Sequence, residues 1–370
     1  VKDPNDPADD GVIMNAALAR FHPSTKKFEI FADGTSNPWG VDFDIHGNAF
    51  VSACVIDHLF HLAPGGLYVR QAGSPAFPFA YELLPSIVDH RHFRAAYAGV
   101  QVYQGGTYPE SMNGKIFMGN IHHNSIHQDE LVKNGSSFRA KEERDFVKSN
   151  DGWFRPVAVK TGPDGNLWIM DWYDKYPCYQ NAMANPEGVD RQYGRIWRVV
   201  YTGGEKKVAT SVFPAGVYLN LDSKYVVKYL EHKNNWIRRK ARQILSEKKD
   251  ASVTGQLVSL VEGHSRVAVR LEALWTLHGA KTLTDSLLDQ LAFDKDTPPA
   301  IKTWVARLSG ERNNLTRGVS ERLSYLANDP DVSVRTAVAT ALRQFMSGSL
   351  TVNTPPRKEV DHKLLGPIFE

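Results

Sequence analysis

Cysteine is almost absent from this chain of 370 residues, which contains only Cys54 and Cys178. No Cys-x-x-Cys pair occurs, so the sequence encodes neither a zinc ribbon nor a covalent haem attachment site. Two buried thiols are the simpler expectation, and a single disulfide is the alternative if the compartment is oxidising.

Long apolar runs and a large excess of one charge are also absent. No stretch approaches ~18 uncharged apolar residues, so the sequence predicts no transmembrane segment. The formal net charge is only +3, which gives no reason to expect nucleic acid as a partner. Phosphate-binding loops, dinucleotide fingerprints, Gly-x-Ser-x-Gly and His-Glu-x-x-His motifs are missing too. Ordinary nucleotide chemistry and catalytic-triad chemistry therefore have no support in the sequence.

What the chain does contain is one hairpin motif that occurs twice, at residues 37–51 and 153–169. In each copy a Gly-Asn pair, Gly47-Asn48 or Gly165-Asn166, separates two runs that are rich in β-forming residues. Repeated hairpins of this kind are typical of the blades of a β-propeller.

The surroundings of these hairpins predict two clear blades and part of a third. Residues 17–21, 27–32 and 57–62 read as strands that join the first hairpin in one blade. Residues 67–100 read as an irregular excursion and residues 133–150 as a polar linker. Because a propeller needs roughly four or more blades to close, we expect the missing blades to come from the same precursor or from another chain.

Beyond about residue 210 a helical repeat replaces the strands. Four segments align on Ile237, Val269, Ile301 and Val334, at spacings of 32, 32 and 33 residues. In each of them β-branched, small or aliphatic residues recur at i, i+4 and i+7, on one face of a helix. A fixed period with one amphipathic helix per unit is typical of an α-solenoid of short HEAT type.

The predicted fold is thus multidomain β plus α: a partial β-propeller, six-bladed in full, followed by a HEAT-like α-solenoid. Residues 1–204 are assigned to the C-terminal blades of the propeller and residues 205–222 to a linker. Residues 223–345 are assigned to the helical repeats, and residues 346–370 to an exit tail.

Histidines are unusually dense between residues 89 and 127. His123 and His127 fall on one face if residues 121–127 form a strand, and two imidazoles plus a carboxylate suit a transition metal. The alternative is that these histidines hydrogen-bond to the backbone or line a polar channel. His90 and His92 flank an arginine and are the only candidates for a catalytic base.

Carboxylates and cations gather around the second hairpin. Asp171 and Asp174 follow a strand that should run near the propeller axis, where their oxygens would suit Ca²⁺; the alternative role for Asp171 is to cap a turn. Arg155, Lys160 and Arg195 would suit an anionic cofactor or a sugar acid if they cluster at the axial mouth. Spread around the rim, they would be ordinary solvated charges.

Five segments carry a resemblance to a known family. They resemble the membrane-bound dehydrogenases of planctomycetes and verrucomicrobia, in which a propeller like that of the soluble quinoprotein sugar dehydrogenases precedes HEAT repeats and often a cytochrome c module. The resemblance covers about residues 10–345, and its most specific segments are residues 37–44, 57–61, 153–157, 162–174 and 194–199.

This resemblance implies a cofactor, pyrroloquinoline quinone (PQQ), and a contact to it from Arg155. His122 stands near the position of a second quinone-binding cation, a lysine in that family, so that contact is weakened or lost. No match to the family's catalytic histidine appears, and a haem c domain would have to lie outside this chain. The resemblance also implies a periplasmic or otherwise extracytoplasmic location and a cytochrome c domain or protein as partner.

Three functional hypotheses follow. The first is a quinoprotein-like dehydrogenase that oxidises a sugar or an alcohol and passes electrons to cytochrome c. The second is a non-catalytic propeller and HEAT scaffold that binds a glycan or a protein partner. The third is a metal-dependent site built on the histidine cluster.

Overall fold

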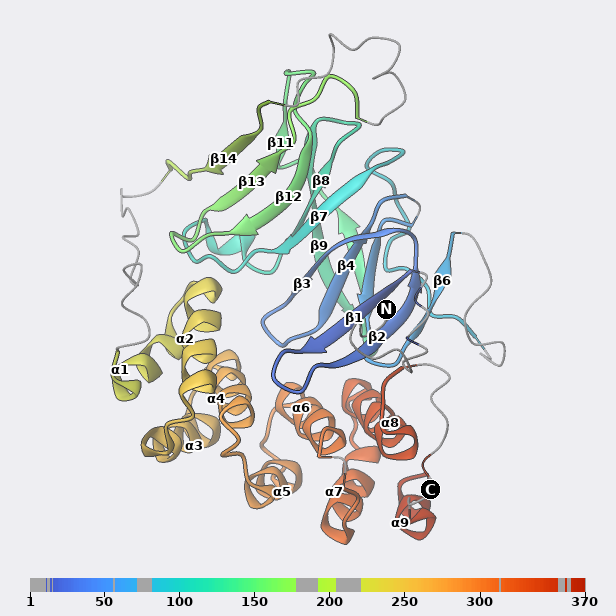
Figure 1. Ribbon diagram of the computed structural model, residues 1–370, viewed down its shortest axis with the longest axis vertical. Coiled ribbons are helices and arrows are strands. Elements are labelled where there is room, and N and C mark those ends of the chain that lie inside the picture. Colours follow the sequence, from blue (N-terminus) through green and yellow to red (C-terminus); the bar gives the residue numbers. More distant parts are fainter. Residues whose placement is uncertain are drawn as a thin grey trace.

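The computed structural model describes residues 11, 14, 16–55, 57–71, 82–177, 192–203, 221–312, 314–351, 357 and 361–369. Cys178 and nearly all of the predicted linker lie outside these residues, while Cys54 is half-buried. The chain has a β part, formed by residues up to 203, and a helical part that begins at residue 221 and lies along one side of it (Figure 1). No helix in the described ranges is both long and apolar enough to span a membrane.

Four sheets make up the β part. One is the antiparallel meander of β3, β4 and β5, and another that of β12, β13 and β14. A third runs β7-β8-β9-β10, with the short β11 paired to β9, and the fourth contains β1, β2 and β6. The strands are β1 (Ala17–His22), β2 (Lys27–Thr35), β3 (Pro38–Phe43), β4 (Ala49–Ala53), β5 (Leu59–Leu62), β6 (Leu67–Arg70), β7 (Tyr97–Val102), β8 (Ile116–Asn120), β9 (Ser125–Asn134), β10 (Ser137–Glu142), β11 (Val147–Lys148), β12 (Pro156–Thr161), β13 (Leu167–Asp171) and β14 (Arg195–Val199).

Both predicted Gly-Asn hairpins are confirmed, as β3-β4 and β12-β13. Gly47 and Gly165 adopt φ values of +79° and +76°, which favour glycine. In each turn an aspartate at its start accepts a backbone hydrogen bond from the asparagine: Asp44 from Asn48 at 2.8 Å, and Asp164 from Asn166 at 3.2 Å. The same side-chain chemistry therefore fixes both turns.

Three of the sheets pack side by side through their first strands. A Cβ atom on Gly40 of β3 would lie 2.9 Å from Cα of Gly99 on β7, and one on Gly99 would lie 2.7 Å from Cα of Ala158 on β12. Glycine at these two positions lets the backbones of neighbouring strands approach closely. This arrangement is that of adjacent propeller blades, and the described sheets do not close into a ring (Figure 1).

Two strand predictions were wrong. β1 and β2 do not join the blade of β3-β5 but pair with β6 in a separate sheet. Segments that were predicted to be irregular or linker also contain strands: residues 67–100 include β6 and the start of β7, and the polar residues 133–150 include β10 and β11. These polar strands bury little side-chain area themselves and are held by pairing with β9.

The C-terminal helical region is confirmed, with a helix at each of the four aligned positions. Each aligned residue falls in the first turn of a helix in the layer nearest the β part (Figure 1). A second layer packs behind it and supplies a partner for each of these helices. The inner layer is α2 (Asn235–Lys248), α4 (Val267–Gly279), α6 (Pro299–Gly310) and α8 (Val332–Ser347), and the outer layer is α1 (Ser223–Val227), α3 (Thr254–Gly263), α5 (Asp285–Phe293), α7 (Arg317–Ala327) and α9 (His362–Phe369).

The segment predicted to be an exit tail is instead partly helical. Within it α9 packs against α7, and Leu365 and Ile368 are buried in the core of the solenoid. This helix covers the apolar face that the last repeat would otherwise expose, which is the role of a capping repeat.

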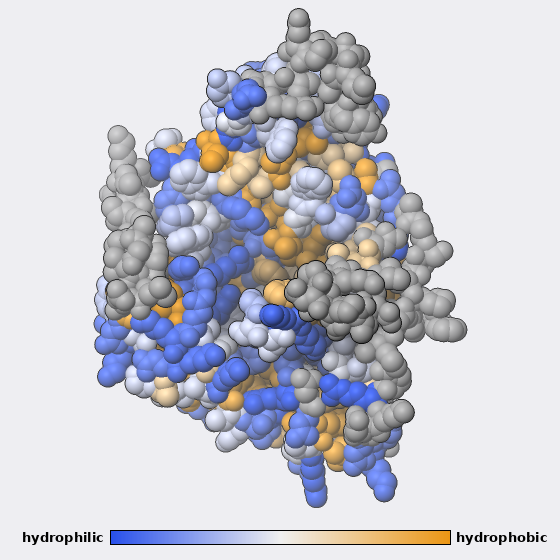
Figure 2. Space-filling model, in the orientation of Figure 1, coloured by the Kyte–Doolittle hydropathy of each residue, from blue (hydrophilic) through white to orange (hydrophobic). Residues whose placement is uncertain are grey.

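The helical part holds the first blade directly. The indole Nε1 of Trp304 donates to the carbonyl of His46 at 2.7 Å, and Arg239 donates to the carboxylate of Asp42 at 2.9 Å. On the face shown in Figure 2, hydrophobic surface gathers over the middle of the β part, whereas hydrophilic residues cover most of the helical part.

Candidate metal centre

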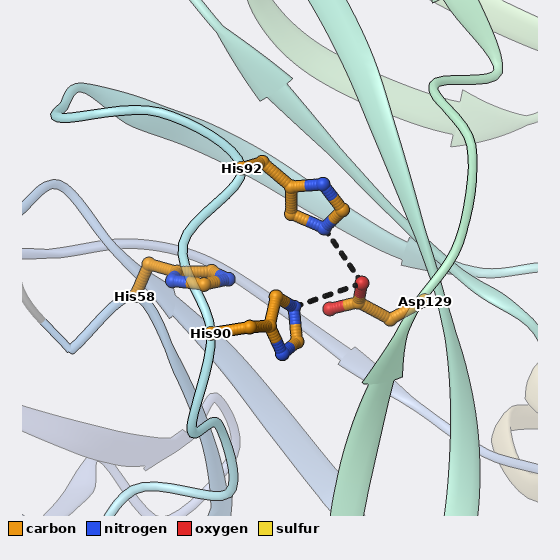
Figure 3. Close-up of side chains that lie close together, drawn as sticks. All are labelled: His58, His90, His92 and Asp129. Carbon is orange, nitrogen blue, oxygen red and sulfur yellow. Dashed lines mark hydrogen bonds and ion pairs between the residues drawn. The ribbon is translucent and has the colours of Figure 1, made fainter.

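The histidines that are scattered along the sequence converge on one place between the first two blades. His58 directly precedes β5, His90 and His92 lie in the segment before β7, and Asp129 lies on β9. Figure 3 shows the three imidazole rings and the carboxylate turned toward a common centre. A further histidine of β9, His127, stacks on His92 with ring centroids 4.4 Å apart.

Asp129 is the anchor of this cluster. Its side chain is fully buried, and Oδ1 lies 2.6 Å from Nε2 of His92 and 3.3 Å from Nε2 of His90. The other oxygen, Oδ2, is buried without a hydrogen-bond partner among the described residues. Burial raises the pKa of Asp129, but the hydrogen bonds and charges of His90 and His92 outweigh it and hold this pKa below its usual value. The carboxylate is therefore ionised and has one oxygen free to bind a cation.

His58 completes the cluster from the first blade. Its ring stacks on Tyr97 with centroids 4.1 Å apart and planes 10° apart, which fixes the ring orientation. Its Nε2 is buried and has no hydrogen-bond partner in the described part of the chain. Burial lowers the pKa of His58 to about 3. The imidazole is thus neutral at pH 7 and offers a lone pair, the form in which histidine binds metals.

The four residues His58, His90, His92 and Asp129 can reach one ion. One ligand atom from each lies within 4.8 Å of the others. In a tetrahedral site with bonds of ~2.0–2.1 Å, neighbouring ligand atoms are about 3.3 Å apart, so small side-chain rotations would close the shell. Three imidazoles and one carboxylate form a donor set that suits zinc, iron and other first-row divalent metals.

A second group lies on the other side of the His92 ring. Nδ1 of His127 lies 2.6 Å from Oδ1 of Asp145, and Nδ1 of His92 lies 4.0 Å from the same oxygen. Ligand atoms of His92, His127 and Asp145 lie within 4.8 Å of one another. His123 is near, with Nδ1 3.9 Å from Oδ2 of Asp145. Burial lowers the pKa of His127 to about 4, so this ring is also neutral at pH 7.

His123 and His127 are neighbours, as predicted, but not because they share a strand face. His123 does not lie on a strand with His127 but in the turn between β8 and β9. The two rings are nevertheless neighbours, with centroids 5.6 Å apart. His58 was not among the predicted site residues and has no local signal in the sequence; only the packing of the first two blades brings it to His90.

The residues predicted to bind a quinone make most of their hydrogen bonds to the protein, although Nε of Arg155 and Nη2 of Arg195 are buried without a partner among the described residues. Arg155, which is nearly fully buried, donates to the side chain of Asn124 and to the carbonyls of Phe154 and Lys175. Arg195 pairs with Asp171 and Asp151, at 2.7 and 2.6 Å.

The four predicted quinone contacts also do not form one cradle. Nζ of Lys160 lies 3.3 and 3.4 Å from the carbonyl oxygens of Val41 and Val100, and Lys160 is separated from Arg155 by most of β12. His122 lies beside Arg155, in the β8-β9 turn, and its pKa is lowered by burial and by this neighbouring charge. No set of uncommitted cations converges on one point here, so the described residues do not fit a tricarboxylate quinone.

Asp171 is the last residue of β13, and Asp174 lies in the loop that follows this strand. Both oxygens of Asp171 are in use: Oδ1 accepts from the backbone N–H groups of Arg155 and Tyr173, and Oδ2 from Arg195 and from the Trp197 indole. Oδ1 of Asp174 accepts from the Tyr176 N–H at 2.9 Å. Asp171 therefore has the turn-capping geometry that was the alternative to calcium binding.

Comparisons with known proteins point to one family. Residues 6–203 match the family model described as domain of unknown function DUF7133. No curated protein matches the chain.

Among solved structures, an oxidoreductase (glucose dehydrogenase) from Thermus thermophilus is 15% identical over 46% of this chain and 46% of its own, with a TM-score of 0.32. A glucose dehydrogenase is 18% identical over 48% of each chain, with a TM-score of 0.31. The soluble aldose sugar dehydrogenase of Escherichia coli, in its apo form, is 18% identical over 38% of this chain and 43% of its own, with a TM-score of 0.29. The chain thus spans less than half the length of each of these proteins.

Proposed function

This chain belongs to the DUF7133 family of domains of unknown function, and from the chemistry of its site we propose that it binds a divalent transition metal ion. The ligands are His58, His90, His92 and Asp129. Zinc is the first choice, because a compact, closed set of four protein ligands is the usual form of a zinc site.

One observation carries this proposal: Nε2 of His58 and Oδ2 of Asp129 are both buried and lack a hydrogen-bond partner among the described residues. Each such atom destabilises the fold by about 1–3 kcal/mol. A network of histidines and carboxylate held only by hydrogen bonds would leave both atoms unsatisfied. A bound metal ion would accept the lone pairs of both atoms, Nε2 of His58 and Oδ2 of Asp129.

The ion would also tie two blades together. His58 comes from the sheet of β3-β5, whereas Asp129 comes from the sheet of β7-β10. His92 and Asp129 are buried, and His90 retains 12% of its side-chain exposure. His90 therefore marks the side from which a fifth ligand or a substrate would approach. A metal ion held by four protein ligands alone would suit a non-catalytic scaffold. A metal ion with a free coordination position beside His90 would suit an enzyme.

The quinoprotein-like dehydrogenase implied by the motifs is a separate proposal. Its support is the motif resemblance, and the engagement of Arg155 and Arg195 by protein oxygens speaks against a quinone beside them. An extracytoplasmic location and a cytochrome c partner rest on the same resemblance. Missing blades have additional support, because β14 ends its sheet and exposes Ile196 and Trp197.

Elemental analysis of the full chain, purified without chelators and then desalted, tests the metal proposal. We expect at least one equivalent of zinc or another first-row metal per chain in the wild type. Asp129→Asn should lose this ion, because the neutral amide is a far weaker ligand than a carboxylate. Asp164→Asn, which changes a turn carboxylate of the second hairpin, is the matched control and should keep it. A wild-type protein that stays metal-free in excess Zn²⁺ would refute the proposal.

A further inference from the structure

His92 is placed between the two groups of ligands. On one side Nε2 lies 2.6 Å from Asp129. On the other side Nδ1 lies 3.5 Å from an oxygen of Glu142 and 4.0 Å from Asp145. The ring is 2% exposed, so water does not satisfy either nitrogen from bulk solvent. A neutral imidazole has one N–H and one lone pair, whereas both nitrogens of His92 face carboxylate oxygens.

The second side of the ring has the parts of a metal site of its own. His127 lies almost parallel to His92, with planes 10° apart, and both rings present Nδ1 to Asp145. Nε2 of His127 is buried and has no hydrogen-bond partner among the described residues, so the proton of the neutral ring lies on Nδ1, toward Asp145. An ion bound at Nδ1 would move that proton to Nε2. Nδ1 of His123 lies 3.9 Å from the other oxygen of Asp145, outside the group of His92, His127 and Asp145, and its side chain would have to rotate to supply a further nitrogen.

We propose that His92 bridges two metal ions, bound by Nε2 in the first site and by Nδ1 in the second, whose other ligands are His127, Asp145 and His123. The inference rests on the proposed function, because the first ion is the one assigned there. The second ion takes the place of the proton on the bridging ring, and that proton leaves to solvent. The two ions would lie about 6 Å apart, since each metal–nitrogen bond is ~2.0–2.1 Å long.

The arrangement divides the ligands by exposure. The side chains of His92 and Asp129 are almost fully buried, whereas Asp145 and His123 keep 24% and 29% of their side-chain exposure. The second ion is therefore the one within reach of small anions and other exogenous ligands. Binding of the second ion would also depend on the first, because both share one ring.

The first experiment counts metal ions on the full chain. Metal-free protein is incubated with excess Zn²⁺, desalted and analysed for metal content; we expect two equivalents in the wild type and one in Asp145→Asn. His22→Asn is the control, because His22 is exposed and lies far from the ligands in the sequence; this variant should keep two equivalents of zinc. No bound metal in the wild type would refute the proposed function. One equivalent that Asp129→Asn removes and Asp145→Asn leaves would uphold the proposed function and refute the bridge.

The second experiment tests the bridge itself, with Cu²⁺ as the probe. Two Cu²⁺ ions joined through one imidazole couple magnetically, so the wild type should show much less than two equivalents of ordinary Cu²⁺ signal by electron paramagnetic resonance. Asp145→Asn, left with one ion, should show the full signal of that ion. Two equivalents of uncoupled signal in the wild type would mean that the ions bind separately, and the bridge would be wrong. Because this comparison uses a partly exposed carboxylate, it does not depend on replacing the buried His92.

Discussion

The imidazole rings of His92 and His127 stack at 4.4 Å between centroids, although one belongs to the irregular segment before β7 and the other to β9. Their Nδ1 atoms face the same oxygen of Asp145, at 4.0 and 2.6 Å. This contact joins the two groups of candidate metal ligands into one cluster. A substitution that moves His92 should therefore alter both groups, the one around Asp129 and the one around Asp145.

Metal removal is expected to destabilise the wild type. An ion present at 100 times its dissociation constant stabilises the folded chain by about 2.7 kcal/mol, which corresponds to about 3–4 °C in Tm for a chain of 370 residues. We expect a strong chelator to lower the Tm of the wild type by this amount, and thermal unfolding by circular dichroism is the measurement. The chelator should leave the Tm of Asp129→Asn unchanged. Equal effects on both proteins would mean that the chelator acts elsewhere.

Local patterns predicted the helical part well, but they named only some of the residues that come together in the candidate metal centre. The aligned residues recur every 32 or 33 positions in the sequence, and each of them lies in one of the four helices that this period predicts. By contrast, β10 was hidden because only Ala140 of its side chains is buried, so it shows no clear apolar alternation. His58 joins His90 through the packing of two sheets, a contact between distant segments that no local pattern records.

Gly99 should be intolerant of any side chain. Its φ is +70°, and a Cβ atom would lie 2.7 Å from Cα of Ala158 on the neighbouring blade. Because backbone strain and a steric clash add together, Gly99→Ala should lower the free energy of unfolding by about 2–5 kcal/mol. Chemical denaturation measures this loss.

Gly114 provides the control for the steric part of this effect. Its φ is also positive, at +81°, but no atom of the described residues lies within 4 Å of the position that a Cβ atom would take there. Gly114→Ala should therefore show only the strain, about 1–2 kcal/mol. Equal losses in the two variants would argue against close packing of β7 on β12.

The capping role of α9 can be tested at Leu365. This residue is 3% exposed and lies in the core of the solenoid, so Leu365→Ala should cost about 2–4 kcal/mol through a cavity. Lys363→Ala, on the exposed side of the same helix, should change stability by less than about 0.5 kcal/mol. Urea unfolding of the full chain compares the two. A small effect at Leu365 would mean that residues beyond 346 are a tail, as the sequence first indicated.

His61 should make the stability of the folded chain depend on pH. This histidine of β5 is 5% exposed and lies between Phe50 and Phe138. Burial, and then the charges of Arg307 and Lys133, lower its pKa to about 3. Since the unfolded chain binds a proton near pH 6.5 and the folded chain does not, stability should fall as the pH drops from about 6.5 toward 3. The slope from this one group is up to about 1.4 kcal/mol per pH unit.

Urea unfolding in chelator at pH 7, 6 and 5 measures that slope. His61→Asn keeps a polar group toward Ser137, which lies 3.1 Å from Nδ1 in the wild type, but removes the titrating ring. Below pH 6.5 the free energy of unfolding of this variant should fall less steeply than that of the wild type. The difference in slope should correspond to about one proton fewer taken up on unfolding. His22→Asn controls for the loss of a histidine from the exposed β1-β2 turn. Parallel curves for the wild type and His61→Asn would show that His61 takes up its proton without unfolding, and that the core around β5 admits a charged ring.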